Sequence, residues 1–409
     1  MNLVNLVNLV NLVNLVNPDI IPRNPGHGLS GRFSLKALTV RIDRLELRLL
    51  RLPLVHFFET SFGRVHDRTF LLVTVEGEGE VGYGECVAEQ QPYYSSETTA
   101  TAWHLIEDFI APAVLGVEFA HPREVYPALR RIRGHHMAKA AVEMAAWDLF
   151  ARQQDAPLAK VLGGVRTEIA SGVSIGIQDS LDQLADKVAT ELAAGYRRIK
   201  IKIKPGWDVD AVDTVRSRFG PVPLMVDANA AYTLADAAHL AALDRFDLMM
   251  IEQPLDYDDV ADHARLQQQI GTPICLDESI HTVKIAEEAI HAAACRIINV
   301  KPGRVGGHGQ SIRLHDLCAS HEIPVWHGGM LESGIGRAHN IHLSSLPNFS
   351  LPGDVAASKR YYAPDLIEPP IEVRPDGTIP VPTGPGLGVT IVGDRVARAT
   401  ERAVTLSAR

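Results

Sequence analysis

The chain has 409 residues, of which 46% are hydrophobic and 22% charged, and its formal net charge is −9 at pH 7. This length allows two domains with large hydrophobic cores. The acidic balance excludes binding to nucleic acid through a strongly basic surface. The four cysteines form no CxxC or other closely spaced pattern, so we expect reduced thiols in a cytoplasmic protein.

Residues 2–16 are five copies of Asn-Leu-Val, a period of three that matches neither a strand nor a helix. The stretch lacks the basic start and the small-residue cleavage site of a secretory signal. Asparagine at every third position also argues against a membrane span, so no membrane partner is expected. We therefore expect a disordered low-complexity tail over residues 1–34.

The first folded part, residues 35–165, has the pattern of a small α+β domain. Apolar and charged residues alternate from residue 38, which predicts an antiparallel sheet. Helical patterns follow over residues 98–114, 123–132 and 137–153. The C-terminal segment, residues 371–409, carries the turns PDG and GPGLG, which predict a hairpin that returns to this domain.

Five polar residues recur at nearly constant spacing in the remaining part, residues 166–370. Their successive gaps are 25, 25, 25 and 24 residues, and each residue closes a short apolar run. The five are Lys202, Asp227, Glu252, Asp277 and Lys301. A barrel of eight βα units carries its chemistry at the C-terminal ends of its strands. We therefore expect the five side chains at one barrel mouth, with the first strand at residues 172–175.

The order of acids and bases indicates the chemistry. Three carboxylates on adjacent strand ends repel one another by about 4 kcal/mol per close pair at an effective dielectric constant near 20. A hard divalent cation removes this repulsion, and oxygen ligands favour Mg2+, for which Mn2+ or another divalent ion can substitute. The two lysines flank such a site from opposite sides. This layout suits abstraction of a proton next to a substrate carboxylate and stabilisation of the resulting enediolate.

The run RIKIKIK at residues 198–204 supports this interpretation. Alternation along a strand directs its isoleucines to the outer helices and its lysines to the barrel interior. A lysine that faces a core is costly unless it is paired, so the inward lysines indicate a functional site.

Motifs around these residues resemble a known family. Five of them are KIK (200–202), VDAN (226–229), IEQP (251–254), DES (277–279) and KPGRVGG (301–307). They resemble the enolase superfamily, in its muconate-lactonizing branch. Three others are HMAKAAVEMAAWDL (136–149), GGMLESGIGRAHN (328–340) and LPNFSLPGD (346–354). These resemble the o-succinylbenzoate synthase / N-acylamino acid racemase group. The resemblance implies an α/β fold, a (β/α)7β modified TIM barrel with an N-terminal α+β capping domain.

The resemblance also implies a role for each matching residue. Lys202 and Lys301 are the catalytic bases, and Asp227, Glu252 and Asp277 hold Mg2+. The residues expected to bind substrate are Lys200, Asn229, Ser174, Gly329, Met330 and Glu89. Those expected to support the site are Arg304 and Glu278. Two loops of the capping domain, at residues 56–68 and 86–94, are expected to close over the substrate.

Four positions bear on the substrate and on the branch. Glu89 stands where the group usually has Met or another apolar residue, which leaves the preferred side chain open. Asp354 is one acid where dipeptide epimerases carry an Asp-x-Asp pair for an ammonium, which favours an N-acylated amine. In the sugar-acid dehydratase branch, the His at this position works with an Asp at the end of the sixth strand. Lys301 stands at that place here, so His327 is expected to be structural or pocket-lining. Arg304 either lowers the pKa of Lys301 or forms an ordinary ion pair.

The resemblance leaves two reactions open, racemisation of N-acylamino acids (N-succinylamino acids) and dehydration to o-succinylbenzoate in menaquinone biosynthesis. Alternatives are a muconate cycloisomerase or dipeptide epimerase of the same branch, or a catalytically silent barrel that serves as a binding module. A silent barrel should have lost a base or a metal ligand, and the sequence retains all five. We expect a small-molecule carboxylate as the ligand and a homo-oligomeric assembly.

Overall fold

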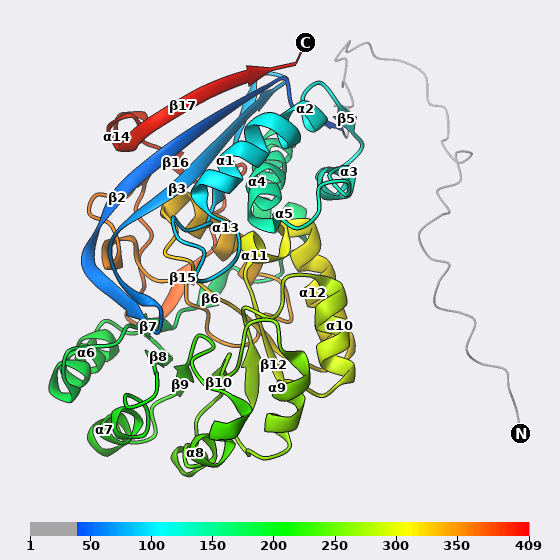
Figure 1. The fold of residues 1–409 in the computed structure, drawn as a ribbon. Coiled ribbons are helices and arrows are strands. Elements are labelled where there is room, and N and C mark those ends of the chain that lie inside the picture. Colours follow the sequence, from blue (N-terminus) through cyan, green and yellow to red (C-terminus); the bar gives the residue numbers. More distant parts are fainter. Residues whose placement is uncertain (1–38, 409) are drawn as a thin grey trace, which may run out of the picture. The chain divides into compact units, whose positions relative to one another are not determined.

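The computed structural model describes residues 39–408, and the tail expected over residues 1–34 lies outside them. The capping domain contains a four-stranded antiparallel sheet in the order β17-β2-β3-β4 (Figure 1). The strands of this sheet are β2 (Arg44–Thr60), β3 (Gly63–Gly77), β4 (Glu80–Cys86) and β17 (Thr400–Ser407). A second, two-stranded sheet joins β1 (Val40–Arg41) to β5 (Glu118–Phe119). The antiparallel sheet expected from the alternation is confirmed.

The tip of the β2–β3 hairpin corrects one expectation. Residues 56–68 were expected to be a loop, but they are mostly strand, because both strands extend far beyond the sheet core. Their pairing shifts register between Pro53 and Phe58, and an irregularity of this kind bends a strand. The hairpin tip reaches the barrel, where the Ser61 hydroxyl donates to the Asn229 carbonyl oxygen at 3.0 Å.

The C-terminal segment does not form the expected hairpin. Its strands are β15 (Thr378–Pro380), β16 (Thr390–Ile391) and β17, with α14 (Gly393–Ala399) before the last. β15 pairs with β6 (Glu168–Ala170), β16 pairs with β14 (Ile367–Glu368), and β17 pairs with β2. The prediction was wrong because each strand finds an unpaired edge elsewhere in the fold, and turn residues carry no information on such distant partners.

The helices of the capping domain match the first and third expected stretches and cover the second only in part. Residues 99–114 form one helical stretch with a π turn in its middle, made of α1 (Thr99–Leu105), η1 (Ile106–Ile110) and α2 (Ala111–Val114). The second stretch holds only the short η2 (Pro122–Glu124) and α3 (Val125–Ala128). The third is α4 (His136–Gln153), a long helix rich in alanine, the best helix former.

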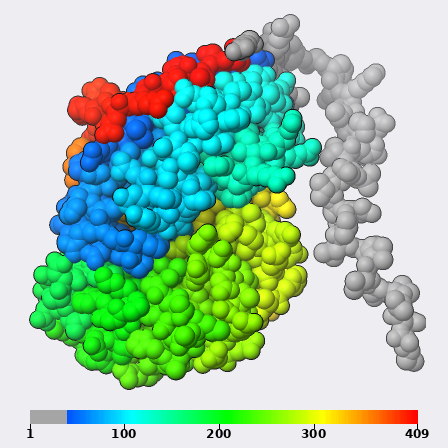
Figure 2. Space-filling model, viewed as in Figure 1, coloured from blue at the N-terminus to red at the C-terminus, as the bar shows by residue number. Residues whose placement is uncertain are grey.

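Helix α4 is buried around nearly its whole circumference. One side lies on β4, where a Cβ at Gly82 or Gly84 would collide with carbonyl oxygens of the helix. The opposite side faces the barrel. Its sequence therefore has no polar face, because it is an internal layer between the sheet and the barrel rather than a surface helix. Figure 2 shows the blue and cyan capping residues packed directly on the green and yellow barrel residues.

The barrel is a curled parallel sheet in the order β13-β12-β11-β10-β9-β8-β7 (Figure 1). Its strands are β7 (Val173–Ile175), β8 (Ile199–Lys202), β9 (Leu224–Asp227), β10 (Ile251–Glu252), β11 (Ile274–Leu276), β12 (Ile297–Val300) and β13 (Val325–His327). The helices that follow them are α6 (Leu181–Ala193), α7 (Val209–Phe219), α8 (Ala237–Ala241), α9 (Val260–Gln267), α10 (Val283–His291), α12 (His308–Ser320) and α13 (Gly334–Ser344). Covered strands of this kind need apolar runs on both faces, which is what the sequence provides.

The eighth strand position closes the barrel with isolated bridges instead of a regular strand. Gly353 bridges to Ser171, and the Gly172 N–H donates to the Gly353 carbonyl at 2.7 Å. On the other side, the Asp354 N–H donates to the His327 carbonyl at 2.7 Å. These bonds join the first and seventh strands through one short segment, which places Asp354 at the barrel mouth. The modified barrel with an N-terminal cap is confirmed.

One buried acid links the cap to the barrel. Glu143 of α4 is fully buried and accepts from the Trp147 indole N–H at 2.6 Å. It also accepts from the N–H groups of His308 and Gly309, both at 2.8 Å, at the start of α12. Burial raises the pKa of Glu143 to about 8, and the three donors oppose that shift.

Glu143→Ala is expected to destabilise the protein, because three buried donors lose their acceptor at about 1–3 kcal/mol each. We expect the melting temperature to fall by roughly 5–10 °C in a thermal-shift measurement. Glu287→Ala, at an exposed position on α10, is the matched control and should change the melting temperature by about 1 °C or less. Equal melting temperatures for the two variants would contradict the role of Glu143.

Candidate active site

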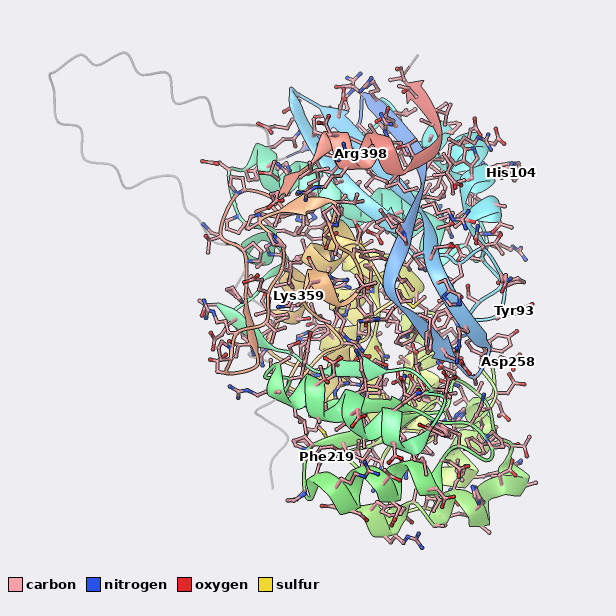
Figure 3. The ribbon with its side chains drawn as sticks, turned by 90° about the vertical axis from the view of Figure 1, so that its left-hand side faces the viewer. Tyr93, His104, Phe219, Asp258, Lys359 and Arg398 are labelled. Atoms are coloured by element: carbon pink, nitrogen blue, oxygen red, sulfur yellow. The ribbon has the colours of Figure 1, made fainter. Side chains whose placement is uncertain are left out.

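A cavity lies at the C-terminal ends of the barrel strands, beneath the capping domain. Its empty volume is about 870 Å3 including the open mouth, which is the size of a small-molecule site. It brings together every residue that the sequence assigned to catalysis or substrate binding. These are Lys202, Lys301, Lys200, Asn229, Ser174, Gly329, Met330 and Glu89. Tyr93, labelled in Figure 3, lies at the exposed rim of this cavity.

The strand β8 directs its lysines inward, as the alternation predicted. Lys200 and Lys202 are buried among carboxylates, whereas the lysine at 204 reaches solvent beyond the end of the strand. The Lys200 amine lies 2.6 Å from Asp354, 2.8 Å from Glu252 and 3.1 Å from Asp227. Burial disfavours the charged form of Lys200, but Asp354 and the other two acids outweigh burial and raise its pKa.

Lys202 has its own set of partners. Its amine donates to Asp227 Oδ2 at 2.6 Å and to Asn229 Oδ1 at 2.5 Å. Asn229 in turn donates from Nδ2 to Glu278 Oε1 at 2.8 Å. Asn229 has a left-handed backbone (φ 42°), which asparagine tolerates better than most residues. Glu278 therefore orients Asn229, and Asn229 orients the Lys202 amine toward the cavity.

Lys301 lies on the other side of the cavity, directly after β12. Its amine donates to Asp277 Oδ2 at 2.7 Å and to the Tyr94 hydroxyl at 3.1 Å. It also lies 4.6 Å from the centre of the Tyr94 ring. Burial disfavours the charged form of Lys301, but Asp277 outweighs burial and raises its pKa in this arrangement.

Arg304 forms the ion pair that was one of its two expected roles, and the pKa of Lys301 is nevertheless raised. It follows Lys301 on the short helix α11 (Pro302–Val305) and forms a buried ion pair with Asp277. Its Nε donates to the Ile280 carbonyl at 2.6 Å, so the guanidinium is fixed in place. Its charge also acts to lower the pKa of Lys301, although Asp277 has the larger effect.

The three carboxylates expected to hold a metal come from adjacent strands at one level. Glu252 is the register partner of Asp227 in the β9–β10 pair, and Asp277 follows β11. All three are buried. Burial and the neighbouring Asp227 raise the pKa of Glu252, which reflects the repulsion expected for adjacent acids. Lysine and arginine side chains hold the carboxylates, and among residues 39–408 no three acidic, His or Cys side chains are arranged to hold one ion.

The charges around these carboxylates are balanced by protein groups. Five acids are buried here, and they are Asp227, Glu252, Asp277, Glu278 and Asp354. Five cations face them, and they are Arg198, Lys200, Lys202, Lys301 and Arg304. A site with this composition has no excess negative charge, so a bound divalent cation would leave it positive.

Sequence reasoning missed three residues of the site. Arg198 has the same strand parity as Lys200, so the alternation could have identified it as inward-facing. It is buried, and its Nη1 donates to Asp354 Oδ1 at 2.7 Å. Asn299, two residues before Lys301, donates to Glu252 Oε1 at 2.5 Å. Tyr94 gave only a weak signal, as one of two tyrosines in a loop of the capping domain.

Asp354 and His327 have structural partners. Both oxygens of Asp354 have a protein partner, one Arg198 and one Lys200, so its charge is matched within the protein. His327 is buried, its Nδ1 contacts the Gly328 carbonyl at 2.9 Å, and burial lowers its pKa to about 3. It lines a separate small cavity and not the one that holds the lysines.

The chain was compared with known families and proteins. Residues 46–163 match the mandelate racemase / muconate lactonizing enzyme N-terminal domain, and residues 183–395 match the enolase C-terminal domain-like family. An o-succinylbenzoate synthase from Geobacillus kaustophilus is 51% identical over 89% of this chain and 97% of its own length. An N-succinylamino acid racemase from Thermus thermophilus is 50% identical over 88% of this chain and 98% of its own length.

A solved structure indicates the same family. An enolase superfamily member from Listeria innocua superposes with a TM-score of 0.87 at 40% identity, covering 90% of this chain and all of that one. Within residues 39–408, no helix combines the length and apolarity needed to cross a membrane. The chain belongs to the enolase superfamily, in its mandelate racemase / muconate lactonizing branch, and is an enzyme that resembles the o-succinylbenzoate synthases and N-succinylamino acid racemases.

Proposed function

We propose that the protein abstracts the α-proton of an N-acylamino acid, with an N-succinyl group as the preferred acyl group, and racemises it through two lysines. One observation carries this proposal. Lys202 and Lys301 line one cavity from strands on opposite sides, and three buried carboxylates lie on the strands between them. Two amines can then face the two sides of one α-carbon.

Lysine and arginine groups pair with the carboxylates in the structure, but the chemistry of the donor set suits a divalent cation, because it is three buried carboxylates from adjacent strands and contains only oxygen. Asp227, Glu252 and Asp277 would hold Mg2+. When bound, the ion would supply positive charge that stabilises the enediolate form of the substrate carboxylate.

The protein's own groups then have distinct tasks. Lys200, held by Asp354 and Glu252, is a fixed cation beside the substrate carboxylate. One of the two bases starts neutral and takes the α-proton, while the other starts protonated and delivers a proton to the opposite face. The direction of racemisation decides which lysine has which task. Asn229 and Tyr94 keep the two amines in place between turnovers.

Dehydration to o-succinylbenzoate is the second candidate, supported by relatives of both names at about half identity. Both reactions begin with removal of a proton next to a carboxylate, so one site suits both. Dehydration needs one base, which we assign to Lys202, with Lys301 as a cation near the ring. A silent barrel is not supported, since both lysines and all three carboxylates are in place.

N-succinyl and N-acetyl amino acids are expected to turn over far better than dipeptides or free amino acids. The physical reason is that Arg198 and Lys200 already match the charge of Asp354, and the eighth strand position has no second acid to receive an ammonium. A panel of the three substrate classes, compared by kcat/KM for racemisation, tests this expectation. Comparable values for dipeptides would contradict the N-acyl assignment.

A further inference from the structure

Glu89 is a carboxylate in the cavity lining that the proposed mechanism does not use, and its surroundings indicate a role. The residue lies between β4 and α1, and its main chain is fixed because the Thr99 N–H donates to the Glu89 carbonyl at 2.8 Å. The side chain is 36% exposed and lines the same cavity as the two lysines. The main chain at Glu89 is therefore held in place, and its side chain borders the cavity.

The Glu89 carboxylate has capacity to accept further hydrogen bonds. Its partner is Arg68, whose Nη1 lies 3.9 Å from Oε1, beyond hydrogen-bonding distance. Arg68 is buried and donates instead to the Val87 carbonyl at 2.5 Å. Within the described chain the structure gives the Glu89 side chain no hydrogen bond, so a ligand donor can approach both of its oxygens.

Arg64 is the other charged residue of the capping domain that lines the cavity, and it already has partners. Arg64 donates to Glu59 and to Asp179, each at 2.7 Å, and its guanidinium lies 3.8 Å from the centre of the Phe57 ring. Its charge is therefore matched by two carboxylates. Glu89 differs, because its one ion-pair partner, Arg68, lies 3.9 Å away and makes no hydrogen bond to it, so its oxygens keep the capacity to accept from a ligand.

The cavity lining around Glu89 and Arg64, here called the outer wall, is otherwise mainly apolar and aromatic. It includes Phe58, Phe62, Met330 and Leu331. A substrate bound by its carboxylate at Lys200 must extend its other substituents toward this wall. A long aliphatic side chain that ends in a cation would cover the apolar part and place its charge at Glu89. An acidic side chain would meet a carboxylate instead.

We propose that Glu89 selects substrates with a cationic side chain, so that the protein prefers N-acylated amino acids of the lysine or arginine class. This inference rests on the proposed racemase function. It also favours racemisation over dehydration as the main activity, because the cyclohexadiene substrate of the latter has no cationic group to meet Glu89.

The test compares two substrates that differ in one group. N-succinyl-lysine carries an ammonium at the end of its side chain, and N-succinyl-norleucine has the same aliphatic chain without it. For the unmodified protein, kcat/KM should be about tenfold higher for N-succinyl-lysine than for N-succinyl-norleucine. A fully buried charged hydrogen bond would give a larger ratio, but Glu89 is partly exposed. Glu89→Gln should bring the ratio close to one, and N-succinyl-glutamate should gain relative to both.

Gln90→Ala is the matched control, because Gln90 is the exposed neighbour of Glu89 and lies outside the cavity lining. It should keep the lysine-to-norleucine ratio of the unmodified protein. A ratio that does not change in Glu89→Gln, or a preference for norleucine in the unmodified protein, would overturn the role of Glu89. Failure of the proposed function looks different, because then neither N-succinyl substrate would be racemised by any variant.

Discussion

The Lys301→Ala variant is expected to racemise an N-succinyl amino acid roughly 10²–10⁴-fold more slowly than the unmodified protein. It should still exchange the α-proton of one enantiomer. Lys301 faces the cavity from the β12 side and Lys202 from the β8 side, so each amine reaches one face of the α-carbon. Removal of one base leaves the other able to take and return a proton on its own face. Proton NMR in deuterated buffer, with each pure enantiomer, measures exchange and inversion separately.

Lys202→Ala is expected to show the opposite enantiomer preference. Lys204→Ala is the matched control, because Lys204 belongs to the same run of lysines but is 41% exposed and pairs with Glu59 outside the metal and base cluster. It should racemise both enantiomers. The two-base assignment is wrong if either Lys202→Ala or Lys301→Ala exchanges both enantiomers at the rate of the unmodified protein.

The structure supports independent behaviour of the two lysines, because their supporting contacts do not overlap. Lys202 is held by Asp227 and by Asn229, which Glu278 orients. Lys301 is held by Asp277 and by Tyr94. Tyr94 comes from the capping domain, so this domain contributes directly to the position of one base.

The sequence predicted the barrel side of the site because the relevant signals are local. The nearly constant spacing from Lys202 to Lys301 follows from a repeated strand–helix unit, and the inward direction of Lys200 and Lys202 follows from strand alternation. Neither inference requires knowledge of which segments meet in space. The structure brings these side chains into one cavity, as the repeat implied.

The contacts that tie distant segments together could not be predicted in this way. Arg198 and Asp354 are 156 residues apart, and Tyr94 and Asp277 are 183 apart. Which partner each side chain selects depends on how the cap and the eighth strand position close on the barrel. The same limit explains the wrong expectation for the C-terminal hairpin, whose strands pair with partners far away in the sequence. Residues 56–68 differ, because there the two strands of one hairpin pair locally and continue beyond the sheet core.

The second large effect concerns the metal. Glu252→Gln is expected to abolish turnover and Mg2+ binding while the fold is retained. Glu252 is fully buried between Asp227 on β9 and the strand that leads to Asp277, so it is the central acid of the three. Glutamine has the same shape and can still accept from Asn299, but it removes one negative charge from the ligand set. In the unmodified protein, activity should be lost in chelator and restored by Mg2+ or Mn2+.

A thermal-shift titration with MgCl2 reads binding without relying on activity. A ligand that binds only the folded state stabilises it by about 2.7 kcal/mol at a concentration 100 times its Kd, so the melting temperature of the unmodified protein should rise with Mg2+. Glu252→Gln should lose that rise. Asp258→Asn, which removes the same charge from an exposed residue labelled in Figure 3, should keep it. If Glu252→Gln retains the Mg2+ response, or turns over substrate in metal-free buffer, Glu252 is not a ligand and the three carboxylates serve only to pair with the lysines.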